Sequence, residues 1–233
     1  MSSFLKIFFV VITLFCLSYQ SQGQNFDYDK DYPKILARTK LANDSLYYPT
    51  LLQKFLVNDK KLTVYETLAL MIGFTGNKYY LPYSYIKTER IIKELNDKEH
   101  YQEAINVADS FLKKHPLSQQ AIIEKAYSYH KLNQKDSAIF YKEQFGRLMA
   151  AMDWSNDGRT PETAMFAIGH HDGQNFVDKY YHANLGKKGN IEDKNGNLCE
   201  MLEMKFKKDG KENTVVFFFV IQHATNTLQE KKD

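Results

Sequence analysis

Cysteine is scarce in this chain, and the scarcity limits how the fold can be stabilised. Only Cys16 and Cys199 occur among 233 residues. Cys16 lies in an N-terminal segment that we expect to be removed, so Cys199 would have no internal disulfide partner. We therefore expect Cys199 to be a buried, unreactive thiol. The fold must depend on a hydrophobic core, and a hydrophobic content of 43% is enough to build one.

An excess of charge of one sign is also lacking. The 31 basic and 28 acidic residues give a formal net charge of +3. This near-balance argues against nucleic acid as a partner and against a polybasic contact with a membrane surface.

Apolar runs long enough to span a membrane are missing as well. Such a helix needs roughly 20 apolar residues, whereas the N-terminal run extends only from Ile7 to Leu17. Lys6 precedes this run and small polar residues follow it, which is typical of a secretory signal peptide. Phe15 stands where a lipid anchor on Cys16 would need a small residue. We predict a signal peptide at residues 1–23 and an exported mature protein, periplasmic or extracellular, with no membrane span.

Familiar catalytic motifs are absent from the sequence. It contains no His-Glu-x-x-His, no Gly-x-Ser-x-Gly and no phosphate-binding Gly-rich loop. Asp153, Ser155, Asp157 and Gly158 fit the first half of a calcium loop, but Ala164 stands where the bidentate glutamate is needed. We therefore expect no metal and no cofactor, and interpret this stretch as a turn that leads into a strand.

Helical patterns fill residues 24–152. Asp31 is a plausible N-cap for a helix with Pro33 in its first turn. Pro49 can open a second helix, and Thr63 with Glu66 forms a capping-box pattern before a third. The pattern continues through residues 88–95 with apolar residues on one side.

A repeat is visible in the last part of this helical region. Ile105 and Ile139 each follow an alanine and lie 34 residues apart, and the same spacing separates Phe111 from Phe145. A 34-residue period with small residues at close helix contacts is typical of tetratricopeptide hairpins. Only about two units are visible, whereas independent stability usually needs three repeats. We expect the preceding helices to supply the third layer.

The pattern changes after residue 152, where Gly and Asn become frequent and β-rich runs begin. Asp209 and Gly210 form a hairpin-turn signal between two of these runs. We predict a small α+β region at 153–225, with a strand at 163–169, a helix at 174–183, a polar Gly-rich loop at 185–197, strands at 198–206 and 214–221, and then a flexible tail at 226–233. The predicted fold class is α+β, with tetratricopeptide-like helical hairpins followed by a small, mainly antiparallel sheet with one helix.

Two stretches carry a family resemblance. Ser155-Asn-Asp-Gly-Arg-Thr-Pro-Glu-Thr-Ala164 precedes an apolar strand, and Gly73-Phe-Thr-Gly-Asn-Lys-Tyr-Tyr-Leu-Pro-Tyr83 lies upstream. Together they resemble a family of exported Bacteroidetes proteins, domain of unknown function 4919. His170-His171-Asp172 departs from the acidic stretch expected there. The resemblance implies a fold over most of the mature chain but no activity.

The candidate binding residues are mainly aromatic. One group surrounds Pro82 and could form a stacking platform for a sugar or a peptide, although packing between helices is the interpretation that we favour. A second group lies on the helical hairpins, whose concave faces suit peptide segments. The residues concerned are Tyr79, Tyr80, Tyr83 and Tyr85 in the first group, and Tyr127, His130 and Asn133 in the second.

These features favour a non-enzymatic binding or scaffold protein of the cell envelope, with a peptide or protein partner. The alternative is a hydrolase-type enzyme whose site would combine Asp157, Glu162, His170 and His171 at the junction of the helical and sheet regions. A third hypothesis is a purely structural subunit of a larger envelope assembly, which would leave an apolar patch exposed.

Overall fold

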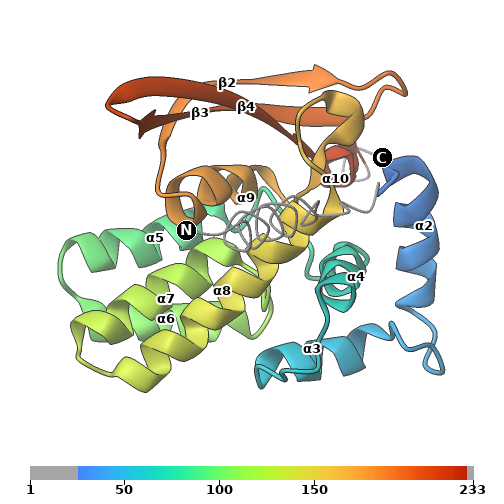
Figure 1. Ribbon diagram of the computed structural model, residues 1–233. Coiled ribbons are helices and arrows are strands. Elements are labelled where there is room, and N and C mark those ends of the chain that lie inside the picture. Colours follow the sequence, from blue (N-terminus) through green and yellow to red (C-terminus); the bar gives the residue numbers. More distant parts are fainter. Residues whose placement is uncertain (1–25, 230–233) are drawn as a thin grey trace, which may run out of the picture.

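The computed structural model describes residues 26–229 and has the α+β architecture that the sequence predicts (Figure 1). A helical part comes first and a small sheet follows. The predicted signal peptide lies outside the described residues and stays a prediction. The helices of the first part are α2 (Tyr28–Arg38), α3 (Tyr48–Leu56), α4 (Val64–Thr75), α5 (Ile86–Asp97), α6 (Tyr101–Leu112), α7 (Gln119–Lys131) and α8 (Lys135–Ser155).

Helices α5 to α8 form two hairpins, α5 with α6 and α7 with α8, and α6 packs against α7 between them. A small core of Ile92, Ala104, Ala108 and Ala121 lies at their contact, and none of these four side chains is exposed. Alanine lets helices approach closely, and the 34-residue period therefore corresponds to two stacked tetratricopeptide-like units.

The N-terminal helices supply the expected additional layer. Helix α4 is buried on every side and packs on α2, α3 and α8. Its predicted capping box is confirmed, because Glu66 N donates to Thr63 Oγ1 at 3.1 Å and Thr63 N donates to Glu66 Oε2 at 2.8 Å. The predicted N-cap at Asp31 is wrong. Helix α2 starts earlier, at Asp27, whose side chain accepts a hydrogen bond from Lys30 N.

The sheet has the strand order β1-β4-β3-β2. β1 pairs with β4 in parallel, and the other two pairs are antiparallel. Asp209 and Gly210 form the predicted turn between β3 and β4, both with positive φ, at 53° and 74°. The strands are β1 (Met165–Phe166), β2 (Asn184–Glu192), β3 (Leu198–Lys208) and β4 (Lys211–Val220).

Several local predictions for the second part differ from the structure. The strand predicted at 163–169 is only β1, and the helix predicted at 174–183 occupies residues 170–180. The polar segment predicted as a loop at 185–197 contains β2, which pairs with β3 through contacts such as Asn190 with Glu200. β2 is an edge strand with mostly exposed side chains, so it carries no apolar alternation that a sequence pattern could detect. The predicted tail from Asn226 is helical as far as Gln229, because helix α10 (Gln222–Gln229) follows the last strand.

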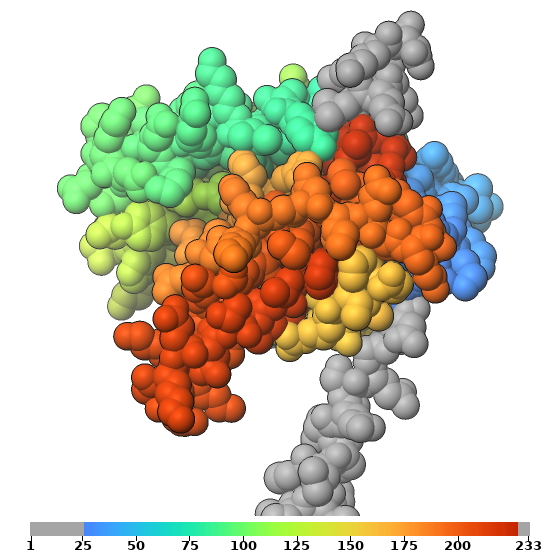
Figure 2. Space-filling model, turned by 90° about the horizontal axis from the view of Figure 1, so that it is seen from above, coloured from blue at the N-terminus to red at the C-terminus, as the bar shows by residue number. Residues whose placement is uncertain are grey.

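A short helical layer separates the sheet from the hairpins (Figure 1). It consists of α9 (His170–Asn175) and the π-helix η2 (Phe176–Tyr180). Phe176 is fully buried and meets Phe217 and Phe219 of β4 edge-on, with ring centroids 5.8 and 5.6 Å away. The opposite face of the sheet is turned outward in Figure 2, where the end of the β3–β4 hairpin projects beyond the body.

The stretch from Asp153 to Ile168 is the junction of the two parts. Ser155 ends α8, and its Oγ accepts a hydrogen bond from Phe166 N at 2.9 Å. Gly158 has a φ of 63°, which favours glycine, and Asp157 Oδ1 accepts from Thr163 Oγ1 at 2.7 Å. This hydrogen-bonded turn leads directly into β1, as predicted. No helix in the part of the chain that the structure describes is long and apolar enough to cross a membrane.

Candidate functional site

The aromatic segment around Pro82 contributes mainly to packing. Tyr80 is 4% exposed, and its hydroxyl donates to the Ile168 carbonyl at 2.6 Å. Tyr85 packs edge-on against Phe111, with ring centroids 5.9 Å apart. Both rings therefore hold the helical part against the sheet region or against the next helix. Neither forms an open stacking platform.

Tyr79 and Tyr83 have different surroundings. Tyr79 is exposed, and Lys78 and Lys114 lie 5.1 and 5.9 Å from its ring centroid. Tyr83 OH lies 2.8 Å from His170 Nε2, so it belongs to the junction with α9. Of the four predicted tyrosines, Tyr79 is the one that keeps an exposed aromatic surface.

The four residues of the predicted hydrolase site do not come together in one site. Asp157 lies in the turn before β1 and lines none of the hollows described below. Glu162 lies beside a hollow at the start of α2, whereas His170 and His171 line a small cavity beneath α9. The hydrogen bonds of His170 and His171 go to Tyr83 and Glu89 and do not involve either predicted acid.

Glu89 of α5 is the partner of His171 that the sequence did not single out. Its buried carboxylate lies 3.4 Å from His171 Nδ1 and accepts a hydrogen bond from Ser118 Oγ at 2.6 Å. The bond to Glu89 raises the pKa of His171 above its usual value. Glu89 falls on the apolar side of its helix. A charged residue at such a position is unusual, and this was the signal by which the sequence could have identified Glu89.

Two further buried carboxyls lie near this pair. Burial raises the pKa of Asp172 to about 8, with a further contribution from the Glu89 charge, although Ile168 N and Gly169 N both donate to it. Burial also raises the pKa of Glu200 to about 7. The cavity beside Asp172 measures about 20 Å³, which is room for one water molecule and no substrate.

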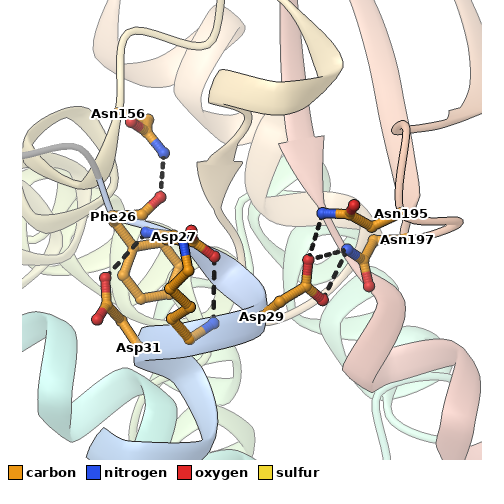
Figure 3. Close-up of polar contacts among 8 residues, drawn as sticks. Phe26, Asp27, Asp29, Asp31, Asn156, Asn195 and Asn197 are labelled. Atoms are coloured by element: carbon orange, nitrogen blue, oxygen red, sulfur yellow. Dashed lines mark hydrogen bonds and ion pairs between the residues drawn. The ribbon is translucent and has the colours of Figure 1, made fainter.

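A larger hollow of about 540 Å³ lies at the start of α2 and is bordered by several acidic side chains. Figure 3 shows how they are engaged. Asp29 accepts hydrogen bonds from Asn195 Nδ2 at 2.6 Å and from Asn197 Nδ2 at 3.0 Å. Asp27 pairs with Lys30, and Asp31 accepts from the Asp27 backbone. These contacts tie the first described helix to the loop before β3. Within residues 26–229, no group of three or more His, Cys, Asp or Glu side chains could hold a metal ion.

Cys199 is buried, and burial raises the pKa of its thiol to about 12. A thiol with this pKa is protonated at neutral pH and is a poor nucleophile. The prediction that Cys199 is buried is confirmed, and its low reactivity stays a prediction that the raised pKa supports.

A groove of about 610 Å³ lies on the helical hairpins. Its floor is apolar, and two of its side chains are strongly exposed, Tyr127 at 44% and Ile139 at 55%. Charged side chains of α5, α7, α8 and η2 surround the floor. The groove is lined by Lys93, Asp97, Ile123, Glu124, Ala126, Tyr127, His130, Lys135, Ala138, Ile139, Lys142 and Lys179.

Two of the three residues predicted on this face line the groove, and the third does not. Tyr127 and His130 line the groove, and the Tyr127 ring is held by Tyr101 at 6.2 Å and by Lys131 at 5.7 Å. Asn133 lies just past the end of α7 with a φ of 59°, and its N–H donates to the His130 carbonyl. Asn133 therefore ends the helix in a left-handed conformation.

Ile139 is the floor residue whose exposure the sequence did not reveal. It is the repeat equivalent of Ile105, which is only 3% exposed. Residues 156–229 form no further helical hairpin after α8, so the apolar side chain of the last unit stays uncovered. The signal was present in the sequence as a repeat without a successor.

The fold and this groove define the class of the protein, an α+β protein with tetratricopeptide-like hairpins and an open helical face. The family model described as Domain of unknown function (DUF4919) matches residues 33–230, and the chain belongs to that family. The match includes both the hairpins and the sheet. No curated protein and no solved structure matches the chain.

Proposed function

We propose that the protein is an exported, non-enzymatic binding or scaffold protein of the cell envelope, and that its partner is a peptide segment held in the groove of α5, α7 and α8. The observation that carries this proposal is the apolar floor formed by Ile123, Tyr127 and Ile139. Exposed apolar floors with a polar rim are typical of sites where apolar side chains dock.

The charges around the floor favour an acidic partner. Four lysines line the groove, against Asp97 and Glu124. Glu124 already accepts hydrogen bonds from Asn96 and Gln120, and Asp97 pairs with Lys93 at 2.6 Å. The partner that fits is therefore a peptide with apolar side chains flanked by aspartate or glutamate.

A hydrolase that uses Asp157, Glu162, His170 and His171 remains the alternative. It is the weaker proposal, because Glu162 and the histidines line separate hollows and Asp157 lines neither of them. No specific observation favours substrate turnover at either place.

The test is fluorescence anisotropy with fluorescein-labelled peptides that have a leucine-rich centre. Three versions of each peptide carry glutamate, glutamine or lysine on both sides of the centre. We expect the glutamate version to bind most tightly and its Kd to rise with salt, because screening weakens the lysine contacts.

The matched variants are Ile139→Asp and Leu41→Asp. Both replace an exposed apolar side chain, at 55% and 58% exposure, but Leu41 lies outside the groove. We expect Ile139→Asp to weaken binding at least about tenfold, because the peptide would bury an unpaired carboxylate. Leu41→Asp should bind like the wild type. Equal affinities of the two variants, or no preference among the three peptides, would overturn the proposal.

A further inference from the structure

A second hollow adjoins the groove. Lys93 and Lys179 line both, so one ligand can extend from the groove into the hollow. The second hollow measures about 370 Å³ and lies between α5 and the α9–η2 layer. Its walls are formed by Ile86, Glu89, Arg90, Lys93, Gln120, His171, Gln174, Asn175, Asp178, Lys179 and Leu185.

The cations of this hollow are held only loosely. Arg90 lies 3.4 Å from Glu94, and their side chains are 69% and 53% exposed. Lys93 pairs with Asp97, and both side chains are also about half exposed. Exposed ion pairs contribute little to stability, so a carboxylate from a ligand can replace the present partners of Arg90 and Lys93 at little cost.

The acidic groups of the same walls are already engaged. Glu89 is buried and has Ser118 Oγ and His171 Nδ1 as partners. Asp178 pairs with Lys179 at 3.1 Å. The hollow therefore offers a ligand positive charge and hydrogen-bond donors more readily than negative charge.

An independent observation comes from Asn175. Its side chain is 5% exposed, and its Nδ2 has no hydrogen-bond partner within the described part of the chain. A buried donor without an acceptor is costly, and each such group in a folded protein needs an explanation. Asn175 lies on the wall of this hollow, next to Gln174.

We propose that this second hollow binds a side-chain carboxylate at its cations, from an aspartate or glutamate of the same peptide whose apolar side chains lie in the groove. This inference rests on the proposed function for the identity of the ligand, but the hollow is testable by itself. A chain that runs along the groove presents side chains to the hollow, and Arg90 and Lys93 would then contact the carboxylate.

The test is an NMR titration of the ¹⁵N-labelled protein with three small probes. N-acetylglutamate α-amide carries only the side-chain carboxylate, N-acetylglutamine carries only the main-chain carboxylate, and N-acetylglutamine amide carries neither. We expect saturable shifts of the backbone amides of Gln174, Asn175 and Lys179 with the first probe alone. Equal effects of the first two probes would overturn the assignment to a side chain.

Arg90→Gln and Lys87→Gln form a matched pair on α5, because both side chains are exposed but Lys87 lies outside the hollow. We expect Arg90→Gln to weaken binding of the first probe at least about tenfold, with no effect of Lys87→Gln. Peptide binding in the groove without probe shifts at the hollow would refute this inference alone. Probe shifts at the hollow without any peptide binding would refute the proposed function and leave the hollow as a carboxylate site.

Discussion

The Glu89 carboxylate on α5 lies 3.4 Å from Nδ1 of His171 on α9. The same carboxylate accepts a hydrogen bond from Ser118, the N-cap of α7, so it joins three helices. Asp172 is the next residue along α9 and is also buried. Titratable groups are thus concentrated where the hairpins meet the layer beneath the sheet, and the stability of this junction should depend on pH.

Three groups at this junction should lower the free energy of unfolding as the pH rises from 5 to 9, and His223 opposes them below pH 6.5. The pKa is raised for Asp172 to about 8, for Glu200 to about 7, and for His171 above 6.5, so the folded state binds more protons than the unfolded chain. Asp172→Asn removes one of these groups and should flatten the dependence, which is at most about 1.4 kcal/mol per pH unit for one group. Urea unfolding of both proteins across this pH range measures the pH dependence of the free energy of unfolding.

Asp209→Asn is the control for this measurement, because Asp209 lies in the exposed turn between β3 and β4 and its φ of 53° suits asparagine. It should keep the pH dependence of the wild type. The same slope in Asp172→Asn would contradict the assignment of a raised pKa to Asp172.

His223 predicts a separate loss of stability in acid. Its ring is fully desolvated on α10 and stacks on Phe166 at 4.7 Å and on Tyr32 at 5.4 Å, and burial lowers its pKa from 6.5 to about 3. Below pH 6.5 the unfolded chain takes up a proton that the folded state does not bind, so stability falls as the pH decreases toward 3. His223→Phe should keep the stacking and reduce this fall. Thermal unfolding at pH 7, 5 and 4 tests the expectation, and His100→Phe, at an exposed histidine, should behave like the wild type.

Two helical glycines should respond oppositely to alanine. A Cβ on Gly173 would lie 2.7 Å from Phe219 Cδ2 and 2.9 Å from Leu202 Cδ1, both in the fully buried layer under the sheet. Gly173→Ala should therefore destabilise the protein by about 1–3 kcal/mol. A Cβ on Gly146 of α8 meets nothing within 4 Å, so Gly146→Ala should stabilise by about 0.5–1 kcal/mol through helix propensity. Denaturant midpoints of both variants decide this, and a stabilising Gly173→Ala would show that α9 is not tightly packed.

Ile105 and Ile139 occupy equivalent positions in the two repeats, but their replacement by alanine should have very different effects on stability. Ile105→Ala removes a buried side chain and should cost about 2–5 kcal/mol. Ile139→Ala removes an exposed one and should change the free energy of unfolding by less than about 0.5 kcal/mol. Equal losses, measured by urea unfolding, would mean that Ile139 is covered in solution by another part of the chain or by a second molecule.

Much of the fold could be predicted because its signals are local. The Thr63–Glu66 capping box and the Asp209–Gly210 turn depend on residues that are near neighbours in the chain, and each unit of the 34-residue repeat is a hairpin of two helices adjacent in sequence. β2 escaped prediction because an edge strand with exposed faces needs no apolar alternation. Helix α2 was placed too late because Asp27 and Asp31 are both suitable caps, and only the backbone geometry chooses between them.

By itself the sequence determined the class of architecture, the hairpins and the central strands, because hydrophobic periodicity and capping act between residues a few positions apart. The tertiary structure decided which side chains meet. It paired Glu89 with His171 across 82 positions, buried Tyr80 against Ile168 and left Ile139 uncovered. These relationships depend on how whole helices pack and where the stack of hairpins ends, and no local pattern carries that information.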